Sequence, residues 1–309
     1  MNKRILLISI AVFIVLLVTA AGIKNFIVSR SVRSLEMAKS KIDAVYDYAL
    51  ILYSQKEYDK ALRAFEIIAN QKSDPGKRED ALNKLAQIYL FKKDLISARN
   101  YYKEIVEYFP DAKEIADIQK KMEDINMKLL FSPVITEESV SYVIKPNDTL
   151  GKIAREHNTT VELIKKSNNL SSDIIIPGNM LKVNNANFNI FVDKSQNILF
   201  LKRNGEIIKA YTVSTGANNS TPVGKFKIEE KMVSPVWYKM GAIVSSDSAE
   251  YELGKRWMGI SVKGYGIHGT NDPSSIGKQI TKGCVRMQNP DVEELYAIVP
   301  SGTEVEIVD

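Results

Sequence analysis

One short stretch of the sequence, YGIHGTNDPSSIGKQITKGCVRM (residues 265–287), holds the only cysteine of the chain and one of its two histidines. A cysteine thiol becomes a nucleophile when a neighbouring base removes its proton, and an imidazole is the most frequent such base. Cys284 and His268 are therefore a candidate nucleophile and base. The alternative is that Cys284 is a small buried apolar residue, as many free cysteines are.

The neighbours of Cys284 favour the chemical interpretation. Gly283 precedes it and lets other groups approach closely, and Arg286 projects to the same face if the segment is extended. A thiol with an ordinary pKa of about 8.5 is mostly protonated at pH 7. An imidazolium and a guanidinium nearby lower that pKa. We therefore expect a thiolate at Cys284, paired with His268 and flanked by Arg286.

Other site chemistries fit this composition poorly. One cysteine and two histidines, with no HxxxH or CxxC spacing, do not form a zinc site. We therefore expect no metal and no cofactor. In papain-type hydrolases the cysteine precedes the histidine, the reverse of the order here. The second histidine, His157, follows an expected helix, where a structural role is usual. A net charge of +5 gives no argument for binding nucleic acid.

The N-terminal segment, residues 1–30, is expected to be a transmembrane signal-anchor. Two basic residues precede an uncharged run over residues 5–23, which is long enough to cross a hydrocarbon core of about 30 Å as a helix. The alternative is a signal peptide cleaved near Ala20 or Ala21, although the apolar region of such peptides is usually only about 7–15 residues. Both interpretations place the bulk of the chain outside the cytoplasm, with the anchor form being a single-pass protein of the cell membrane.

Residues 31–132 have helical periodicity and an internal repeat. Ala49 in YALILYSQKEYDKALRAFEIIA recurs as Ala86 in LAQIYLFKKDLISARNYYKEIVEYFP, and neighbouring positions recur at the same interval. Small residues at this spacing resemble tetratricopeptide repeats, whose usual period is about 34 residues. We expect an all-α TPR-like domain that ends with a helix over residues 113–130. It either docks a protein partner or acts as a spacer.

Residues 133–140 are expected to be a linker, because Pro133 and polar residues interrupt the helical pattern. The segment that follows, residues 141–184, contains SYVIKPNDTL, ELIKKSN and IIPGNMLKV. It predicts a strand at 142–144, two helices and a closing strand. This pattern closely resembles the LysM domain, a small α+β (βααβ) module that binds glycans containing N-acetylglucosamine.

The LysM resemblance implies a shallow glycan-binding groove between two loops. The first loop joins the opening strand to a helix capped by Asp148 or Thr149, and the second precedes the last strand. The family usually has glycine where Asn147 stands, and asparagine also tolerates positive φ. The implied glycan-binding residues are Asn147, Asp148, Thr149, Ile175, Ile176 and Pro177.

The remaining residues, 188–309, have the pattern of strands. Asn204-Gly205 lies between two strand-like runs and is a strong signal for a tight hairpin. One short helix is expected in NPDVEELYAIV, with Asn289 as N-cap and Pro290 as its first residue.

This last segment resembles the catalytic domain of L,D-transpeptidases of the YkuD type. The family motif has HG, then Ser or Thr, a variable residue, GC, a hydrophobic residue, and Arg or Asn. The chain has His268-Gly269 and TKGCVR over residues 281–286. The resemblance also covers VDKSQNILFLKRNGEIIKAYTVSTG and TPVGKFKI. It implies a mainly-β, sandwich-like domain and completes a multidomain chain.

The resemblance also implies a reaction. Cys284 would attack the amide after the third residue of a peptidoglycan stem tetrapeptide, D-Ala would leave, and an amine of another stem would take the acyl group in a 3→3 cross-link. His268 would be the acid–base and the Gly269 carbonyl would orient it. Amides near Gly283 and Cys284 would bind the oxyanion. Arg286 would hold or polarise the site, its alternative being a structural salt bridge.

Three further residues are candidates for substrate binding, each with a structural alternative. Thr281 could instead support its loop, and Tyr265 and Trp237 could instead belong to the core. Two other functions stay open. Water in place of the amine would give an L,D-carboxypeptidase, and loss of chemistry would leave a non-catalytic scaffold that binds peptidoglycan. Peptidoglycan is the expected partner in every case.

Overall fold

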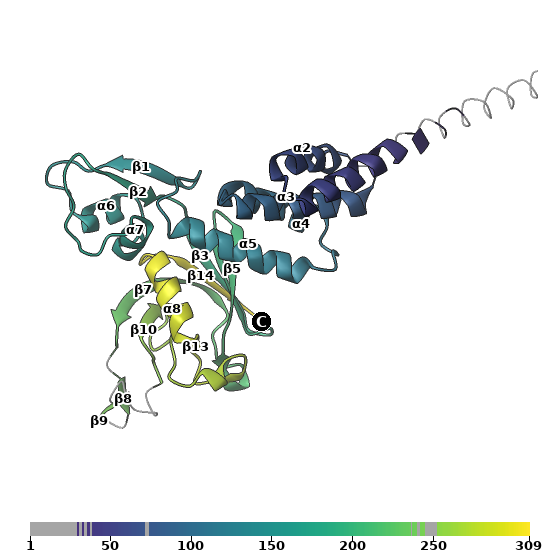
Figure 1. Ribbon diagram of the computed structural model, residues 1–309. Coiled ribbons are helices and arrows are strands. Elements are labelled where there is room, and N and C mark those ends of the chain that lie inside the picture. The colour runs from purple at the N-terminus through teal and green to yellow at the C-terminus, as the bar shows by residue number, and fades with distance from the viewer. Residues whose placement is uncertain are drawn as a thin grey trace, which may run out of the picture. The chain divides into compact units, whose positions relative to one another are not determined.

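The computed structural model describes residues 39–71, 74–235, 237–239, 242–244 and 252–309, together with four residues between 30 and 37 (Figure 1). The chain divides into two compact units, residues 1–115 and 116–309, which we call the N-terminal and C-terminal units. The predicted anchor rests on residues 1–29, which lie outside the described part. Among the described helices none combines the length and the apolar character needed to cross a bilayer.

The N-terminal unit is helical. Its elements are a helix over residues 39–54, α2 (Tyr58–Ala69), α3 (Pro75–Phe91) and α4 (Leu95–Tyr108). Asp74 and Asp94 cap α3 and α4 by accepting backbone N–H bonds. The repeated small residues are fully buried where helices approach closely, at Ala49, Ala61, Ala86 and Ala98. The helical character of this region is therefore confirmed, while its assignment to the tetratricopeptide class stays a prediction.

The C-terminal unit opens with α5 (Ile115–Leu130) and continues into a βααβ module. The module consists of β1 (Ser139–Val143), α6 (Leu150–Glu156), α7 (Val161–Ser167) and β2 (Met180–Asn184). β1 and β2 pair antiparallel, and Thr149 and Thr160 cap the two helices. The predicted order of elements is confirmed. The linker is shorter than predicted, because β1 already begins at Ser139.

The rest of the unit is built on one curled sheet of eight strands in the order β13-β11-β10-β7-β14-β3-β4-β5 (Figure 1). Its strands are β3 (Phe188–Asp193), β4 (Ile198–Arg203), β5 (Glu206–Thr212), β7 (Gly224–Val233), β10 (Arg256–Ile260), β11 (Gly266–His268), β13 (Val285–Arg286) and β14 (Glu304–Val308). Two short pairs accompany it, β6 (Thr215–Gly216) with β12 (Gln279–Thr281) and β8 (Trp237–Lys239) with β9 (Ala242–Val244). One-turn 3-10 helices lie at Ala217–Asn219 and Pro273–Ser275.

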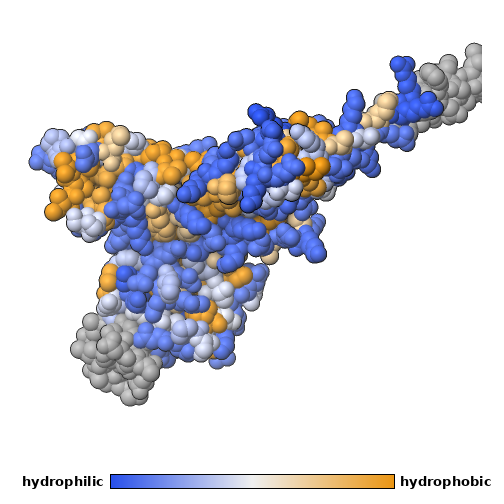
Figure 2. Space-filling view, in the orientation of Figure 1, coloured by the Kyte–Doolittle hydropathy of each residue, from blue (hydrophilic) through white to orange (hydrophobic). Residues whose placement is uncertain are grey.

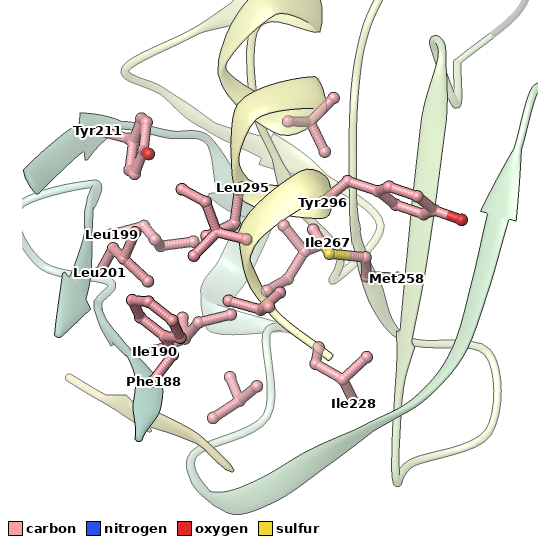
Figure 3. Close-up of a cluster of buried hydrophobic side chains, with 14 of the residues drawn as sticks. Phe188, Ile190, Leu199, Leu201, Tyr211, Ile228, Met258, Ile267, Leu295 and Tyr296 are labelled. Carbon is pink, nitrogen blue, oxygen red and sulfur yellow. The ribbon is translucent and has the colours of Figure 1, made fainter. Parts of the chain in front are cut away.

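The helix α8 (Asn289–Ile298) packs on the apolar face of this sheet. Figure 3 shows Leu295 of α8 among side chains of the strands, such as Ile190 and Leu201. The predicted mainly-β character of this domain is confirmed, and its strands form one curled sheet whose core also includes α8. Residues of α5 join the same core, and Asn126 Nδ2 donates to Ile208 O at 3.1 Å.

Two local predictions have different outcomes. Asn204 and Gly205 have φ of 51° and 86° and connect β4 to β5, as a type I′ hairpin requires. That prediction is confirmed. The N-cap of α8 is Gln288 and not Asn289, which is the first helical residue. The side chain of Asn289 instead accepts a bond from Lys255 N at 3.0 Å, so a tertiary contact has replaced the local cap.

Candidate functional site

The parallel pairing of β11 with β13 brings the predicted residues together. In this pair His268 is in register with Arg286, and Ile267 with Val285. Ile267 and Val285 are buried in the core, so His268 and Arg286 project from the other face of the sheet. Cys284 lies two residues before Arg286. The side chains at 268, 284 and 286 all line one cavity of about 450 Å³.

His268 is held in a buried, oriented position. The residue is 3% exposed, and its ring lies nearly parallel to the Trp257 indole, with centroids 5.8 Å apart. Nδ1 is 2.7 Å from Gly269 O, which can only accept, so Nδ1 carries the proton and Nε2 has the lone pair. Burial is the largest influence on the pKa of His268 and lowers it to about 4. The hydrogen bond to Gly269 raises this pKa but does not offset the effect of burial. His268 is therefore a neutral imidazole at pH 7.

Cys284 is protonated in the same state. Burial raises the pKa of its thiol, and the backbone of Gly266 and the Arg286 guanidinium only partly offset that effect. Sγ donates to Gly264 O at 3.7 Å. The predicted thiolate–imidazolium pair is therefore wrong for the free protein. Loss of water around the sulfur disfavours the anion more than the neighbouring cation favours it.

The loop ahead of Cys284 is fixed by contacts with two neighbours. Gly283 has φ of 127°, and a Cβ there would lie 2.5 Å from the ring of Tyr265. Thr281 Oγ1 donates to Cys284 O at 2.7 Å and accepts from Gly283 N at 3.2 Å. The hydroxyl of Thr281 thus supports the loop. Because the Gly283 amide is bonded to it, the amide of Cys284 is the better candidate for an oxyanion donor.

Charged residues that the sequence did not single out also line the cavity. Glu252 Oε2 lies 3.9 Å from Arg286, and Glu252 Oε1 lies 3.8 Å from Lys282. Glu230 and the Trp257 indole complete the lining on the side of β7 and β10. Lys282 lies inside the TKGCVR motif, but no local motif marks Glu230, Glu252 or Trp257. Glu230 and Trp257 reach the site through the pairing of β7 with β10. The side chain of Trp237 lies outside the described part, and Tyr265 packs against Gly283.

In the candidate glycan site, the side chain of Asp148 is fully engaged in hydrogen bonds with neighbouring residues. The Asp148 carboxylate accepts from Tyr142 OH, Lys145 N and Lys152 Nζ at 2.7–3.0 Å, and its side chain is 0% exposed. The bond from the Lys145 amide is the first cause that lowers the pKa of Asp148 to about 2. Asp148 therefore stabilises the loop, and Asn147 beside it has the expected positive φ of 65°.

The other glycan candidates remain at the surface. Thr149 is exposed, although its Oγ1 caps α6. Ile176 is 61% exposed and Pro177 is exposed next to it. Bonds between Ile144 and the 178–179 segment hold the two loops side by side. Figure 2 shows apolar residues gathered on this module, and they include Val143, Ile174, Ile176 and Met180.

Comparisons with known proteins agree with this architecture. Residues 187–307 match the L,D-transpeptidase catalytic domain of the YkuD family, and residues 142–184 match the LysM domain. A protein named putative L,D-transpeptidase YkuD from Bacillus licheniformis is 35% identical over 175 residues, which are 54% of this chain and 97% of that protein. Its namesake from Bacillus subtilis is 35% identical over 176 residues, 54% of this chain and 98% of that protein.

One solved structure is the catalytic domain of an L,D-transpeptidase from E. faecium. It is 22% identical, with a TM-score of 0.33 over 40% of this chain and 97% of that one. Within the described residues no group of three or more His, Cys, Asp or Glu side chains could hold a metal ion. The sequence matches give the assignment, and the chain belongs to the L,D-transpeptidase family of the YkuD type, with a LysM domain directly ahead of its catalytic domain.

Proposed function

We propose that Cys284 is the nucleophile and His268 the general base of this peptidoglycan L,D-transpeptidase. The observation that carries the proposal is the orientation of the imidazole. Nδ1 donates to Gly269 O, which leaves Nε2 of a neutral ring able to accept a proton in the cavity that Cys284 lines. The Gly269 carbonyl thus has the positioning role that a carboxylate or amide has in other triads.

The acylation step begins from a neutral pair. Sγ of Cys284 attacks the carbonyl carbon of the third residue of a stem tetrapeptide while His268 takes the thiol proton. The C–N bond then breaks, His268 gives this proton to the leaving amine, and D-Ala departs. A thioester remains on Cys284. Because burial disfavours both charged forms, the proton transfer has to accompany the attack and does not precede it.

The second step returns the enzyme to its starting state. An amine of another stem attacks the thioester, loses a proton through His268 to the departing sulfur, and forms a 3→3 cross-link. Water in place of the amine gives a tripeptide, which is the L,D-carboxypeptidase alternative. The Cys284 amide is our candidate for stabilising the oxyanion in both steps, and Arg286 holds the edge of the site.

The accessory parts of the chain serve the same reaction. The LysM and L,D-transpeptidase domains indicate an extracytoplasmic, cell-wall location and binding to peptidoglycan. Residues 1–30 are proposed to anchor the chain in the membrane, and residues 31–132 to act as a TPR-like spacer or partner-docking domain. Tethering of this kind raises the local concentration of substrate, so a modest affinity for sugar is sufficient.

The test is covalent labelling of the full chain with a carbapenem, followed by intact-mass analysis. We expect an adduct with the mass of one inhibitor in the wild type and none in Cys284→Ala. An unlabelled wild type supports the scaffold function instead. Incubation with tetrapeptide-bearing muropeptides then separates the two reactions. Cross-linked dimers indicate transfer, and tripeptides without dimers indicate hydrolysis.

A further inference from the structure

A row of strand partners leads from Cys284 across the sheet to Glu230. Glu230 on β7 is in register with Gly259 on β10, and Gly259 is in register with Gly266 on β11. The pairing of β11 with β13 places Gly266 beside Cys284, whose sulfur its backbone contacts. Two glycines therefore separate the carboxylate from the thiol, and neither has a side chain that could stand between them.

The indole ring of Trp257 covers both glycines. A Cβ on Gly266 would lie 2.8 Å from Cη2 and Cζ2 of Trp257, and a Cβ on Gly259 would lie 3.1 Å from its Nε1. Glu230 Oε2 would lie 3.7 Å from the same Cβ on Gly259. The Trp257 indole thus forms a floor that extends from the His268 ring to the Glu230 carboxylate.

The cavity has opposite charges at its two ends. Lys282 and Arg286 lie on the side of Cys284, where Glu252 is within 4 Å of both. Glu230 lies at the far end, is exposed, and forms no ion pair with another residue in the described ranges. A carboxylate at the end of an aromatic floor recognises a cationic group on an apolar chain, since the ring face and the carboxylate both attract an ammonium ion.

We propose that Glu230 and Trp257 form the subsite that captures the acyl acceptor, by binding its primary amine as an alkylammonium ion. The methylene chain of a diamino acid lies on the indole and its ammonium group contacts Glu230. This inference rests on the proposed function, because it concerns the second half of that reaction. Trp257 contacts His268 as well, so Glu230 is the residue that reports on capture alone.

Capture precedes the bond-forming step and is separate from it. The ammonium ion leaves Glu230, loses one proton to solvent, and reaches Cys284 as a free amine. Its nitrogen attacks the thioester carbon, the C–N bond forms, and the C–S bond breaks. The second amine proton passes through His268 to the sulfur. Glu230 therefore affects the KM for the acceptor and leaves the acylation of Cys284 unchanged.

The experiment compares Glu230→Gln with Glu229→Gln, an exposed neighbour on β7 that does not line the cavity. Full-length protein receives a saturating tetrapeptide donor and increasing amounts of a stem tripeptide that ends in lysine or in diaminopimelate. We expect Glu230→Gln to raise the acceptor KM about tenfold, since it removes one charge-assisted contact. The kcat for transfer at saturating acceptor stays the same, and more tripeptide forms at low acceptor concentration.

Ionic strength provides a second readout. Added salt should raise the acceptor KM of the wild type and of Glu229→Gln, and it should have little effect on Glu230→Gln. The inference is overturned if Glu230→Gln leaves the acceptor KM within about twofold of the wild type, or if it slows carbapenem labelling to the same extent as transfer. Absence of labelling in the wild type would instead contradict the proposed function, so the two failures are distinguishable.

Discussion

His268 on β11 and Arg286 on β13 are register partners, and Met287 N donates to His268 O at 2.8 Å next to them. A parallel pair needs a long connection between its strands. Here residues 269–284 make that connection, and Cys284 is its last residue. The distance between His268 and Cys284 in the sequence is thus the length of this one connection. The site is assembled when β13 pairs with β11.

The reactivity of Cys284 should increase well into the alkaline range. Because burial raises the pKa of the thiol, the rate of alkylation by iodoacetamide is expected to rise with pH to a midpoint above the ordinary value for cysteine. The chain has one cysteine, so the incorporated label reports on this site alone. A rate that is already maximal at neutral pH would show that the thiolate is the resting form.

Protonation of His268 should destabilise the fold. Its pKa is about 4 in the folded protein and ordinarily 6.5, so between these values the unfolded chain binds more protons. The free energy of unfolding therefore rises with pH across this window. About 3 kcal/mol is present above pH 6.5 and is lost as the pH falls to about 4. Urea unfolding from pH 4 to 7 should show a smaller pH dependence in His268→Gln, and equal slopes would refute the assignment.

Gly283→Ala should impair acylation by displacing the loop. Its φ of 127° is unfavourable for alanine, and the new Cβ would meet the ring of Tyr265. Backbone strain of this kind costs about 1–3 kcal/mol. We expect carbapenem labelling at least about tenfold slower, with a lower Tm. Addition of Tyr265→Ala removes the steric contact and not the strain, so it should restore only part of the rate. Full recovery would mean that φ is unimportant.

The hydroxyl of Thr281 should be required to position Cys284. Thr281→Val keeps the shape and removes the bonds to Cys284 O and Gly283 N. The buried Gly283 amide then lacks a partner, at a cost of about 1–3 kcal/mol, and the partly buried Cys284 carbonyl loses its bond as well. We expect slower labelling in Thr281→Val and recovery in Thr281→Ser. If both variants label equally slowly, then the methyl group, and not the hydroxyl, holds the loop.

Ile176 is expected to contribute to glycan binding through its exposed side chain. Ile176→Ser should reduce cosedimentation with insoluble peptidoglycan at least about threefold without lowering the Tm, because burial of one isoleucine on binding is worth about 1 kcal/mol or more. Ile207→Ser is the matched control, since Ile207 is 47% exposed on β5. Equal sedimentation of the two variants would remove Ile176 from the site.

Features that depend on local chemistry could be predicted from the sequence. The hairpin at Asn204-Gly205 follows from two residues that tolerate positive φ, and the cap at Thr149 follows from a hydroxyl ahead of a helix. The grouping of Cys284, His268 and Arg286 could be inferred from a motif, although their pairing across β11 and β13 could not. Strand order is set by contacts between distant segments, and no local pattern encodes them.

The ionisation of the site was beyond sequence reasoning for a related reason. The types of residue near Cys284 suggested a lowered pKa, whereas the structure raises it. Burial decides the sign, and burial depends on how the whole domain packs. That Glu230 and Trp257 line the cavity could not be predicted from the sequence for the same reason, since each lies on a strand that reaches the cavity only in the folded sheet. The N-cap of α8 was also predicted wrongly, because the side chain of Asn289 accepts a hydrogen bond from the Lys255 amide and does not cap the helix.

The position of β14 has a consequence for how the protein is made. This strand lies between β7 and β3, and it joins the half of the sheet that ends next to Cys284 to the half that begins at residue 188. A growing polypeptide cannot join the two halves until residue 308 has left the ribosome. The part of the sheet that positions Cys284 therefore becomes continuous with β3, β4 and β5 only after β14 has been synthesised, so this sheet is completed late in the synthesis of the domain.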